Sequence, residues 1–370
     1  MTEVRAAVLR AVGEPMSVET ILLKSPGPND VRVRIDQTGV CHSDLSLARG
    51  TLAQPLPAVL GHEACGTVVE VGGRISDLEV GQRVILLWIT PCGSCFHCIR
   101  GETHLCETGA SRGGDPYAST VDGQPVYPGL SVGSFAEQTV VPREAVIAVP
   151  DDIATGDAAL LGCAVTTGVG AAMFTAGVVP ESTVLVLGLG GVGLSVVLGA
   201  KMAGATTIIA IDRNSDKAGH ALRSGATEFL RADDNTKRAV RELTAGRGVD
   251  FAFDCVGSAR TIRDMWSMTR RGGACTIVGI GAKDDTVSFG ALELFHFART
   301  VRGCVAGSLN ALTDFPRYFE WVRRGELDLS HLITGHGGLC DVERALDELA
   351  AGQGVRTLLS PNSATQGQEI

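Results

Sequence analysis

The first 150 residues carry the alternation of apolar and polar positions that is typical of half-buried β-strands. The segment VRVRID, residues 31–36, places a hydrophobic side chain at every second position. Two further runs, GTVVEVG at 66–72 and GQRVILLW at 81–88, are rich in strand-forming residues and begin or end at glycine. Because a period of two puts alternate side chains on opposite faces of a sheet, we predict a β-rich region here.

From about residue 165 the pattern changes to short apolar strands that alternate with helical segments. The predicted strands are TVLVLG, TTIIAID, VDFAFDCVG and ACTIVGIG, at residues 183–188, 206–212, 249–257 and 274–281. Such alternation predicts an α/β fold with a parallel sheet and right-handed crossovers. After about residue 305 the pattern is mixed again, and we predict helices within 313–325 and 341–352.

Length and charge narrow the class of protein. A chain of 370 residues is too long for one compact core and suits two domains. The net charge of -9 argues against nucleic acid or anionic membrane as a partner, because both require basic surface. We find no apolar signal region and no apolar run of about 18 residues that would indicate a membrane span. We therefore expect a cytoplasmic protein, in which disulfides are disfavoured, with a frayed polar tail at 361–370.

A glycine-rich loop follows the first strand of the α/β region. In GLGGVG the residues Gly188, Gly190 and Gly193 have the G-x-G-x-x-G spacing, and Asp212 ends the next strand. Glycine permits the tight turn, the close approach of a pyrophosphate and the packing of helix on strand, and the acid accepts ribose hydroxyl groups. Asp212 would repel a 2′-phosphate, which favours NAD over NADP, although Arg213 weakens that inference. The alternative is a glycine-rich turn without a ligand.

Four cysteines lie within fifteen residues in the segment CGSCFHCIRGETHLC. They are Cys92, Cys95, Cys98 and Cys106. Four thiolates can close a tetrahedral shell around zinc and hold a loop together without doing chemistry. Iron–sulfur clusters use similar spacings, and a redox C-x-x-C pair is a further alternative. We interpret the two histidines inside this lobe, His97 and His104, as surface residues.

A second set of metal ligands is spread over the first half of the chain. Cys41, His62 and Cys163 offer two thiolates and one imidazole, which would leave the fourth position of a zinc ion open, as in catalytic sites. Spacing alone does not establish this set, because a single cysteine or histidine is more often part of a packed core.

Together these motifs resemble the zinc-containing alcohol dehydrogenases of the medium-chain dehydrogenase/reductase family. The resemblance rests on Gly61–His62–Glu63, the four-cysteine lobe, GCAVTTG and the coenzyme region GLGGVG…IDRNSDK, which occur in the family's order. It implies a GroES-like catalytic domain at 1–163, a doubly wound Rossmann NAD-binding domain at 164–307, and a return to the catalytic domain at 308–370. It also implies two zinc ions per chain, a catalytic one at the three-ligand set and a structural one in the lobe at 92–106.

The resemblance also assigns individual roles. Ser43 would receive the alcohol proton, Asp44 would orient the ligand histidine, and Glu63 would lie near the metal. Trp88 would form a wall of the substrate pocket. Further residues are expected at the coenzyme: His42 and Arg356 at the pyrophosphate, Lys217 near the adenosine ribose, Thr167 and Val192 near the nicotinamide, Gly191 in the loop, and Arg213 and Val278 as further coenzyme-binding residues. The alternative is an ordinary core or surface polar residue for Asp44 and Glu63, and simple core packing for Trp88.

We therefore expect an NAD-dependent zinc alcohol dehydrogenase that interconverts primary alcohols and aldehydes by hydride transfer. One alternative is oxidation of a formaldehyde–thiol adduct formed with glutathione or mycothiol, and another is a catalytically silent relative. One departure concerns Ser46, because many family members have a proton-relay histidine at this position.

We also expect a homodimer. The apolar strand at 298–307 would lie at its interface, because an edge strand needs covering. The segment 107–132, in which we find no strong helix or strand pattern, is expected to be a long loop near the substrate entrance.

Overall fold

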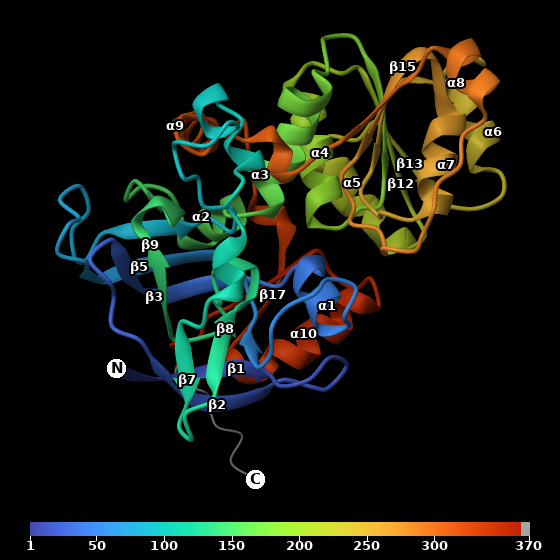
Figure 1. The fold of residues 1–370 in the computed structure, drawn as a ribbon. Helices are drawn as coiled ribbons and strands as arrows, with labels where there is room; N and C mark the ends of the chain where they lie inside the picture. The colour runs from blue at the N-terminus through green and yellow to red at the C-terminus, as the bar shows by residue number, and fades with distance from the viewer. Residues whose placement is uncertain (364–370) are drawn as a thin grey trace. The chain divides into compact units, whose positions relative to one another are not determined.

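The computed structural model describes residues 1–363, and its chain divides into two compact units (Figure 1). The first unit contains Met1–Cys163, Asn310–Gly325 and the chain from Ile333 onward, and the second contains Ala164–Leu309 and Glu326–Leu332. The predicted domain limits stay a prediction, and residues 326–332 group with the second unit although they fall in the range expected to return to the catalytic domain. Of the tail predicted to be frayed, residues 364–370 lie outside the described residues.

The first unit is rich in β-strands. A closed barrel contains β1 (Thr2–Leu9), β2 (Ser17–Leu23), β7 (Ala118–Thr120), β8 (Pro125–Pro128) and β4 (Ala58–Val59). A seven-stranded sheet has the order β10 (Val146–Ala148), β6 (Arg83–Leu86), β5 (Glu63–Val71), β3 (Asp30–Gly39), β18 (Arg356–Leu359), β17 (Ile333–Gly337), with β9 (Gln138–Pro142) paired to β3. The strands predicted at 31–36, 66–72 and 81–88 are thereby confirmed as parts of β3, β5 and β6.

The alternation of residues in β3 explains how this sheet packs. Val31, Val33 and Ile35 are fully buried and belong to one hydrophobic cluster, whereas Arg34 between them is exposed. Alternate side chains thus face the core and the solvent, as the sequence predicts. The predicted helices near the C-terminus are also confirmed, as α9 (Phe315–Arg323) and α10 (Val342–Ala350).

The prediction that 107–132 lacks regular structure is wrong. This segment contains η3 (Ser111–Gly114), the β7 and β8 strands, and η4 (Gly129–Ser131). Strand β8 pairs with β7 in antiparallel and with β4 in parallel orientation, so the segment closes the barrel. Its strands have only three and four residues, and β8 begins and ends with proline, so the sequence offers too short a periodic run to recognise.

The second unit is built on a parallel six-stranded sheet, as predicted. The order is β13 (Glu228–Arg231), β12 (Thr207–Asp212), β11 (Thr183–Leu187), β14 (Val249–Asp254), β15 (Thr269–Ile277), β16 (Thr300–Gly303). The first strand along the chain, β11, lies inside the sheet with β12 on one side and β14 on the other. The strand order therefore reverses there, which makes the carboxyl end of β11 the expected ligand-binding point of a doubly wound fold.

Helices cover both faces of this sheet (Figure 1). One face carries α4 (Gly191–Met202) and α5 (Ala218–Ser224), with α3 (Ala164–Gly170) packed on α4, and the other carries α6 (Thr236–Leu243), α7 (Ala259–Met268) and α8 (Ala291–Phe297). A buried cluster that includes Val240, Met265 and Trp266 fills the space between sheet and helices on the second face. Within the described residues, no single helix has the length and apolar character needed to cross a membrane, and one pair of short helices, Thr155–Leu161 with Ala164–Ala176, meets the criterion on length and composition only.

Candidate metal centres and coenzyme site

The first unit brings Cys41, His62 and Cys163 together, although they are far apart in the sequence. Cys41 immediately precedes α1 (His42–Ala48), His62 immediately precedes β5, and Cys163 follows α2 (Thr155–Leu161). Their candidate ligand atoms all lie within 4.8 Å of one another, and all three residues are buried. The start of α1, the start of β5 and the end of α2 therefore bring three soft or borderline ligands to one point.

Asp44 holds two of these ligands in place. Its Oδ1 atom lies 3.0 Å from Nδ1 of His62 and accepts the backbone N–H of Gly61 at 2.9 Å, while Oδ2 accepts the N–H of Cys41 at 3.1 Å. The carboxylate is fully buried. It selects the tautomer of His62 that has the proton on Nδ1, so the Nε2 atom carries a free lone pair.

The chemistry of this set fits zinc. The Nε2 atom of His62 is buried and has no hydrogen-bond partner among the described residues, which is the state of a nitrogen meant for a metal. A hydrogen bond with Cys163, together with the charge of Arg356, holds the pKa of the Cys41 thiol well below its usual range. A deprotonated thiol and a neutral imidazole are the forms that zinc binds, and three protein ligands leave one position for a substrate oxygen.

Arg356 connects the metal set to Glu63. Both residues are buried, and the Nε atom of Arg356 lies 3.3 Å from Oε1 of Glu63. The Nη2 atom of Arg356 lies 3.6 Å from Sγ of Cys41. Sequence reasoning placed Arg356 at the coenzyme pyrophosphate and missed this contact, because no local pattern links residues 41, 63 and 356.

The other predicted residues of this region lie around the same point or on the surface near it. The Sγ atom of Cys41 lies 3.9 Å from Oγ of the half-buried Ser43, and the ring of Trp88 meets that of His62 edge to face with centroids 6.5 Å apart. His42 is exposed at the start of α1, and Ser46 is half-buried one turn later. Ser43 and Trp88 therefore lie close to the metal set, as their predicted roles require.

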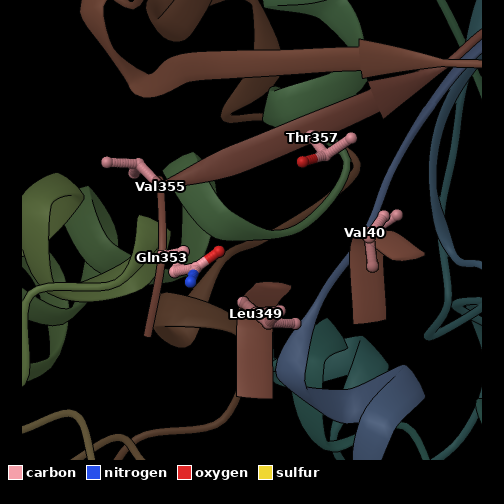
Figure 2. Close-up of a pocket in the computed structure, with 6 residues that line it drawn as sticks. Val40, Leu349, Gln353, Val355 and Thr357 are labelled. Atoms are coloured by element: carbon pink, nitrogen blue, oxygen red, sulfur yellow. The ribbon is translucent and has the colours of Figure 1, made fainter. Parts of the chain in front are cut away.

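A small pocket lies in the same unit, between the end of β3, the α10 helix and β18 (Figure 2). Its cavity volume is about 10 Å³, and it is lined by Val40, Ala345, Leu349, Gln353, Val355 and Thr357. Val40 and Val355 precede Cys41 and Arg356 in the chain, so the pocket neighbours the metal set without containing a predicted site residue.

The second metal set is the four-cysteine lobe. The four Sγ atoms lie within 4.8 Å of one another, and those of Cys92 and Cys98 are 4.0 Å apart. Cys98 begins η1 (Cys98–Arg100), and η2 (Thr103–Leu105) directly precedes Cys106. Backbone N–H groups of Ser94 and Cys95 lower the pKa of the Cys92 thiol to about 5, which favours the thiolate.

The histidines of the lobe, His97 and His104, are outside this ligand group, and both are half-buried. His97 lies 2.9 Å from Glu102 through its Nδ1 atom. Four sulfur ligands leave no open position, so the lobe fits a metal with a structural role.

The glycine-rich loop of the second unit joins β11 to α4. Gly188 has a φ of 86°, a conformation that favours glycine, and Gly190 caps the helix that begins at Gly191. A Cβ atom on Gly193 would lie 1.8 Å from the carbonyl oxygen of Gly188. The loop can therefore form only with glycine at this position, which leaves the N-terminus of the twelve-residue helix open to an anion.

Asp212 lies at the carboxyl end of β12 and braces the same loop. Its Oδ2 atom accepts the N–H of Leu189 at 2.7 Å, and its Oδ1 atom accepts the N–H of Asn214 at 2.9 Å. Arg213 is exposed, and Lys217 is buried at the end of η7 (Ser215–Lys217). The carboxylate is thus fixed beside the glycine loop, where each of its oxygens keeps a lone pair for a further donor.

Thr167 and Val192, predicted at the nicotinamide, and Val278, predicted at the coenzyme, come from three elements of this unit. Thr167 lies on α3 and Val192 on α4, and these helices touch closely because a Cβ atom on Gly168 would be 2.4 Å from the carbonyl oxygen of Val192. Val278 follows β15 and donates its N–H to the carbonyl oxygen of Asp254 at 2.8 Å. Their contact with the coenzyme stays a prediction.

Comparison with known proteins identifies both units. Residues 27–151 match the family model of the alcohol dehydrogenase GroES-like domain, and residues 191–324 match that of the zinc-binding dehydrogenases. The chain is 33% identical to an S-(hydroxymethyl)glutathione dehydrogenase of Paracoccus denitrificans over 96% of this chain and 99% of that protein.

Two solved structures are similar over nearly their whole length. Benzyl alcohol dehydrogenase of Acinetobacter calcoaceticus is 27% identical with a TM-score of 0.89, and the match covers 98% of this chain and 100% of that one. A protein of Sinorhizobium meliloti 1021 assigned to the zinc-binding dehydrogenases, with bound NADP, is 26% identical with a TM-score of 0.82 at 98% and 100% coverage. The chain therefore belongs to the zinc-containing alcohol dehydrogenases of the medium-chain dehydrogenase/reductase family, and it is a zinc-dependent alcohol oxidoreductase that uses a nicotinamide nucleotide.

Proposed function

We propose that this enzyme oxidises primary alcohols to aldehydes with NAD⁺ and catalyses the reverse reaction. The observation that supports this most is the buried set of Cys41, His62 and Cys163. In this set the Nε2 atom of His62 has no hydrogen-bond partner among the described residues. When bound, zinc polarises the alcohol oxygen as a Lewis acid and NAD⁺ accepts the hydride, so that alcohol and NAD⁺ yield aldehyde, NADH and a proton.

The chain's own residues orient the substrate and move the proton. Asp44 keeps the proton of His62 on Nδ1, and Arg356 compensates the negative charge that Cys41 and Glu63 bring into a buried site. Ser43 offers a hydroxyl group that would accept the alcohol proton while passing its own proton on towards the solvent. The indole of Trp88, beside His62, offers an apolar wall that suits an aromatic or long-chain alcohol better than ethanol.

A second candidate function is supported by the relatives. The similar protein of Paracoccus denitrificans is named as an S-(hydroxymethyl)glutathione dehydrogenase, so the adduct of formaldehyde with a thiol is the alternative substrate class. Initial rates of NADH formation would be compared for ethanol, benzyl alcohol, and formaldehyde with glutathione, with mycothiol or with no thiol. A kcat/KM for either thiol adduct that exceeds that for benzyl alcohol would replace the first proposal by the second.

The coenzyme preference rests on Asp212. The position of this carboxylate beside the glycine loop supports NAD, because a 2′-phosphate would meet a negative charge there. The NADP bound by one similar protein makes this a point to measure in the wild-type enzyme. Equal kcat/KM values for NAD⁺ and NADP⁺ would contradict the proposal and turn attention to Arg213.

Two zinc ions per chain and a homodimer complete the proposal, and a cytoplasmic location stays a prediction. The two ligand groups support the stoichiometry, which metal analysis of fully active protein would measure. The dimer is supported by β16, an edge strand whose four residues are exposed, and by α8, where Leu292 and Phe295 are 76% and 83% exposed. Light scattering after size exclusion should give a dimer that Val301→Lys weakens and the control Val121→Lys leaves intact; a wild-type monomer or tetramer would refute it.

A further inference from the structure

The chain from Glu326 to Leu332, here called the docking segment, belongs to the second unit although its two flanks belong to the first. It ends in η9 (Ser330–Leu332), which packs against α5. Its three leucines, at 327, 329 and 332, are each 1% exposed. The chain thus leaves the first unit for seven residues, buries their apolar side chains in the second unit next to α5, and then returns to the first unit.

Hydrogen bonds between the docking segment and α5 centre on two histidines. The hydroxyl of Ser224 donates to the carbonyl oxygen of His220 at 2.9 Å, so its contact of 2.7 Å with Nε2 of His331 makes that nitrogen the donor. The Nδ1 atom of His220 lies 3.3 Å from the carbonyl oxygen of His331 and 3.1 Å from Nη2 of Arg223. Because Arg223 can only donate, the second contact requires an unprotonated Nδ1, whereas a hydrogen bond to the carbonyl oxygen would require a protonated one. Each of these two arrangements is available to a neutral ring.

The charges around the two rings oppose protonation. Arg223, His220 and Lys201 face His331 and oppose its protonation, whereas the carboxylate of Asp328 favours it. Burial and these cations lower the pKa of His331, and burial together with Arg223 and Lys217 lowers that of His220, although the carbonyl of His331 acts in the other direction. Lys201 is close by, since a Cβ atom on Gly225 would be 2.4 Å from its Cδ. The contact is therefore built for two neutral histidines.

The same helix neighbours the expected adenosine site. Helix α5 begins directly after Lys217, which is buried, and His220 follows one turn later. Lys217 and Asp212 are the residues that we expect around the adenosine ribose. A change in how firmly α5 is held therefore bears on how well the adenosine half of the coenzyme is bound.

We propose that the docking segment is a pH-sensitive clamp on α5 that strengthens binding of the adenosine half of NAD at neutral pH and releases it in acid. The coenzyme part of this inference rests on the proposed function, whereas the clamp itself does not. Both histidines are easier to protonate when the segment is released than when it is docked. Docking is therefore firm above the ordinary histidine pKa of about 6.5 and weakens as the pH falls below it. Each histidine can contribute up to about a tenfold change in the opening equilibrium per pH unit.

Hydrogen exchange of the full-length, metal-loaded protein tests the clamp. Protection factors, which remove the intrinsic pH dependence of exchange, would be measured for peptides covering 218–226 and 326–333 between about pH 7.5 and 5.0. We expect protection of both peptides to fall in parallel below about pH 6.5. His331→Gln keeps a donor near Ser224 but cannot titrate, so it should roughly halve the slope of the logarithm of the protection factor against pH. The double variant with His220→Asn should abolish this slope.

Ser224→Ala, which removes the shared hydroxyl, should lower protection at every pH. His336→Gln, at an exposed histidine, is the matched control and should leave protection unchanged.

Calorimetric titration with ADP-ribose probes the adenosine half of the coenzyme site without any need for catalysis. Its Kd should rise below pH 6.5 in the wild type and stay constant in the double variant. Protection that is independent of pH in the wild type, or a double variant that keeps the wild-type dependence, would overturn the clamp. ADP-ribose that fails to bind at any pH would instead refute the proposed coenzyme while leaving the exchange data to decide on the clamp.

Discussion

Replacing Asp44 by Asn should damage the metal set more than its small change in shape suggests. The carboxylate is fully buried and accepts three N–H groups, from Cys41, Gly61 and His62, at 2.9–3.1 Å. An amide has one acceptor atom and one NH₂ group, so at least one of these N–H groups would face another donor. The variant also removes the negative charge that holds the proton of His62 on Nδ1.

The size of the effect follows from these contacts. A buried N–H group left without an acceptor costs about 1–3 kcal/mol of unfolding free energy. For a unit of roughly 200 residues, this corresponds to a melting temperature lower by roughly 2–12 °C. Loss of the carboxylate that orients a ligand histidine typically weakens metal binding by about 10- to 100-fold.

Two measurements check the prediction independently. Thermal unfolding of the metal-free protein reports the lost hydrogen bond, and competition with a chromogenic chelator reports zinc affinity. Asp36→Asn is the matched control, because Asp36 also accepts side-chain hydrogen bonds on the same sheet but lies away from the ligands. If Asp44→Asn matched Asp36→Asn in both stability and zinc affinity, Asp44 would not hold the ligands as we argue.

Three further changes separate the roles of the remaining site residues. Cys98→Ser should leave one zinc ion per chain and lower the thermal stability, whereas Cys41→Ser should abolish turnover with a smaller loss of stability. Metal analysis and thermal unfolding of the same samples would show whether the two cysteines differ in this way. Asp212→Gly should narrow the NAD⁺/NADP⁺ ratio of kcat/KM roughly tenfold or more, because a like-charge contact costs on the order of 1–4 kcal/mol; an unchanged ratio would mean that the carboxylate does not meet the ribose. Arg356→Met should lower the free energy of unfolding by about 3–5 kcal/mol, because the buried Glu63 loses its ion-pair partner, and adding Glu63→Gln should restore much of the loss. Equal denaturant midpoints for the wild type and Arg356→Met would contradict the buried ion pair.

How much the sequence predicts depends on how local each interaction is. The glycine loop after β11 is recognisable because Gly188, Gly193 and the start of α4 lie within a few residues. The four-cysteine lobe is recognisable for the same reason. The set formed by Cys41, His62 and Cys163 needed the family resemblance, since its members are separated by up to about 120 residues and spacing alone left packing as an alternative.

The features that the sequence did not predict have short or mixed patterns. Strands β7 and β8 are too short for a period of two to stand out, and they are defined by their pairing with β2 and β4. The docking segment has its leucines at positions 327, 329 and 332, and this spacing favours neither a strand nor a helix clearly. Its role depends on His220 and Ser224, which lie more than 100 residues earlier in the chain.

The buried charges beside the metal set show why the C-terminal part of the chain is required as well. All three expected ligands lie within the first 163 residues, yet Glu63, which follows the ligand His62, is fully buried and is paired with Arg356, which is 293 residues away in the chain. Arg356 begins β18, and this strand pairs with β3 through Leu358 and Leu359, next to the residues that lead into Cys41. An N-terminal fragment would therefore contain the ligands but leave a buried carboxylate without its cation, at a cost that exceeds most single interactions. Completion of the metal set is thus coupled to docking of the C-terminal strand, which makes the long-range return of the chain to the first unit a condition for the chemistry.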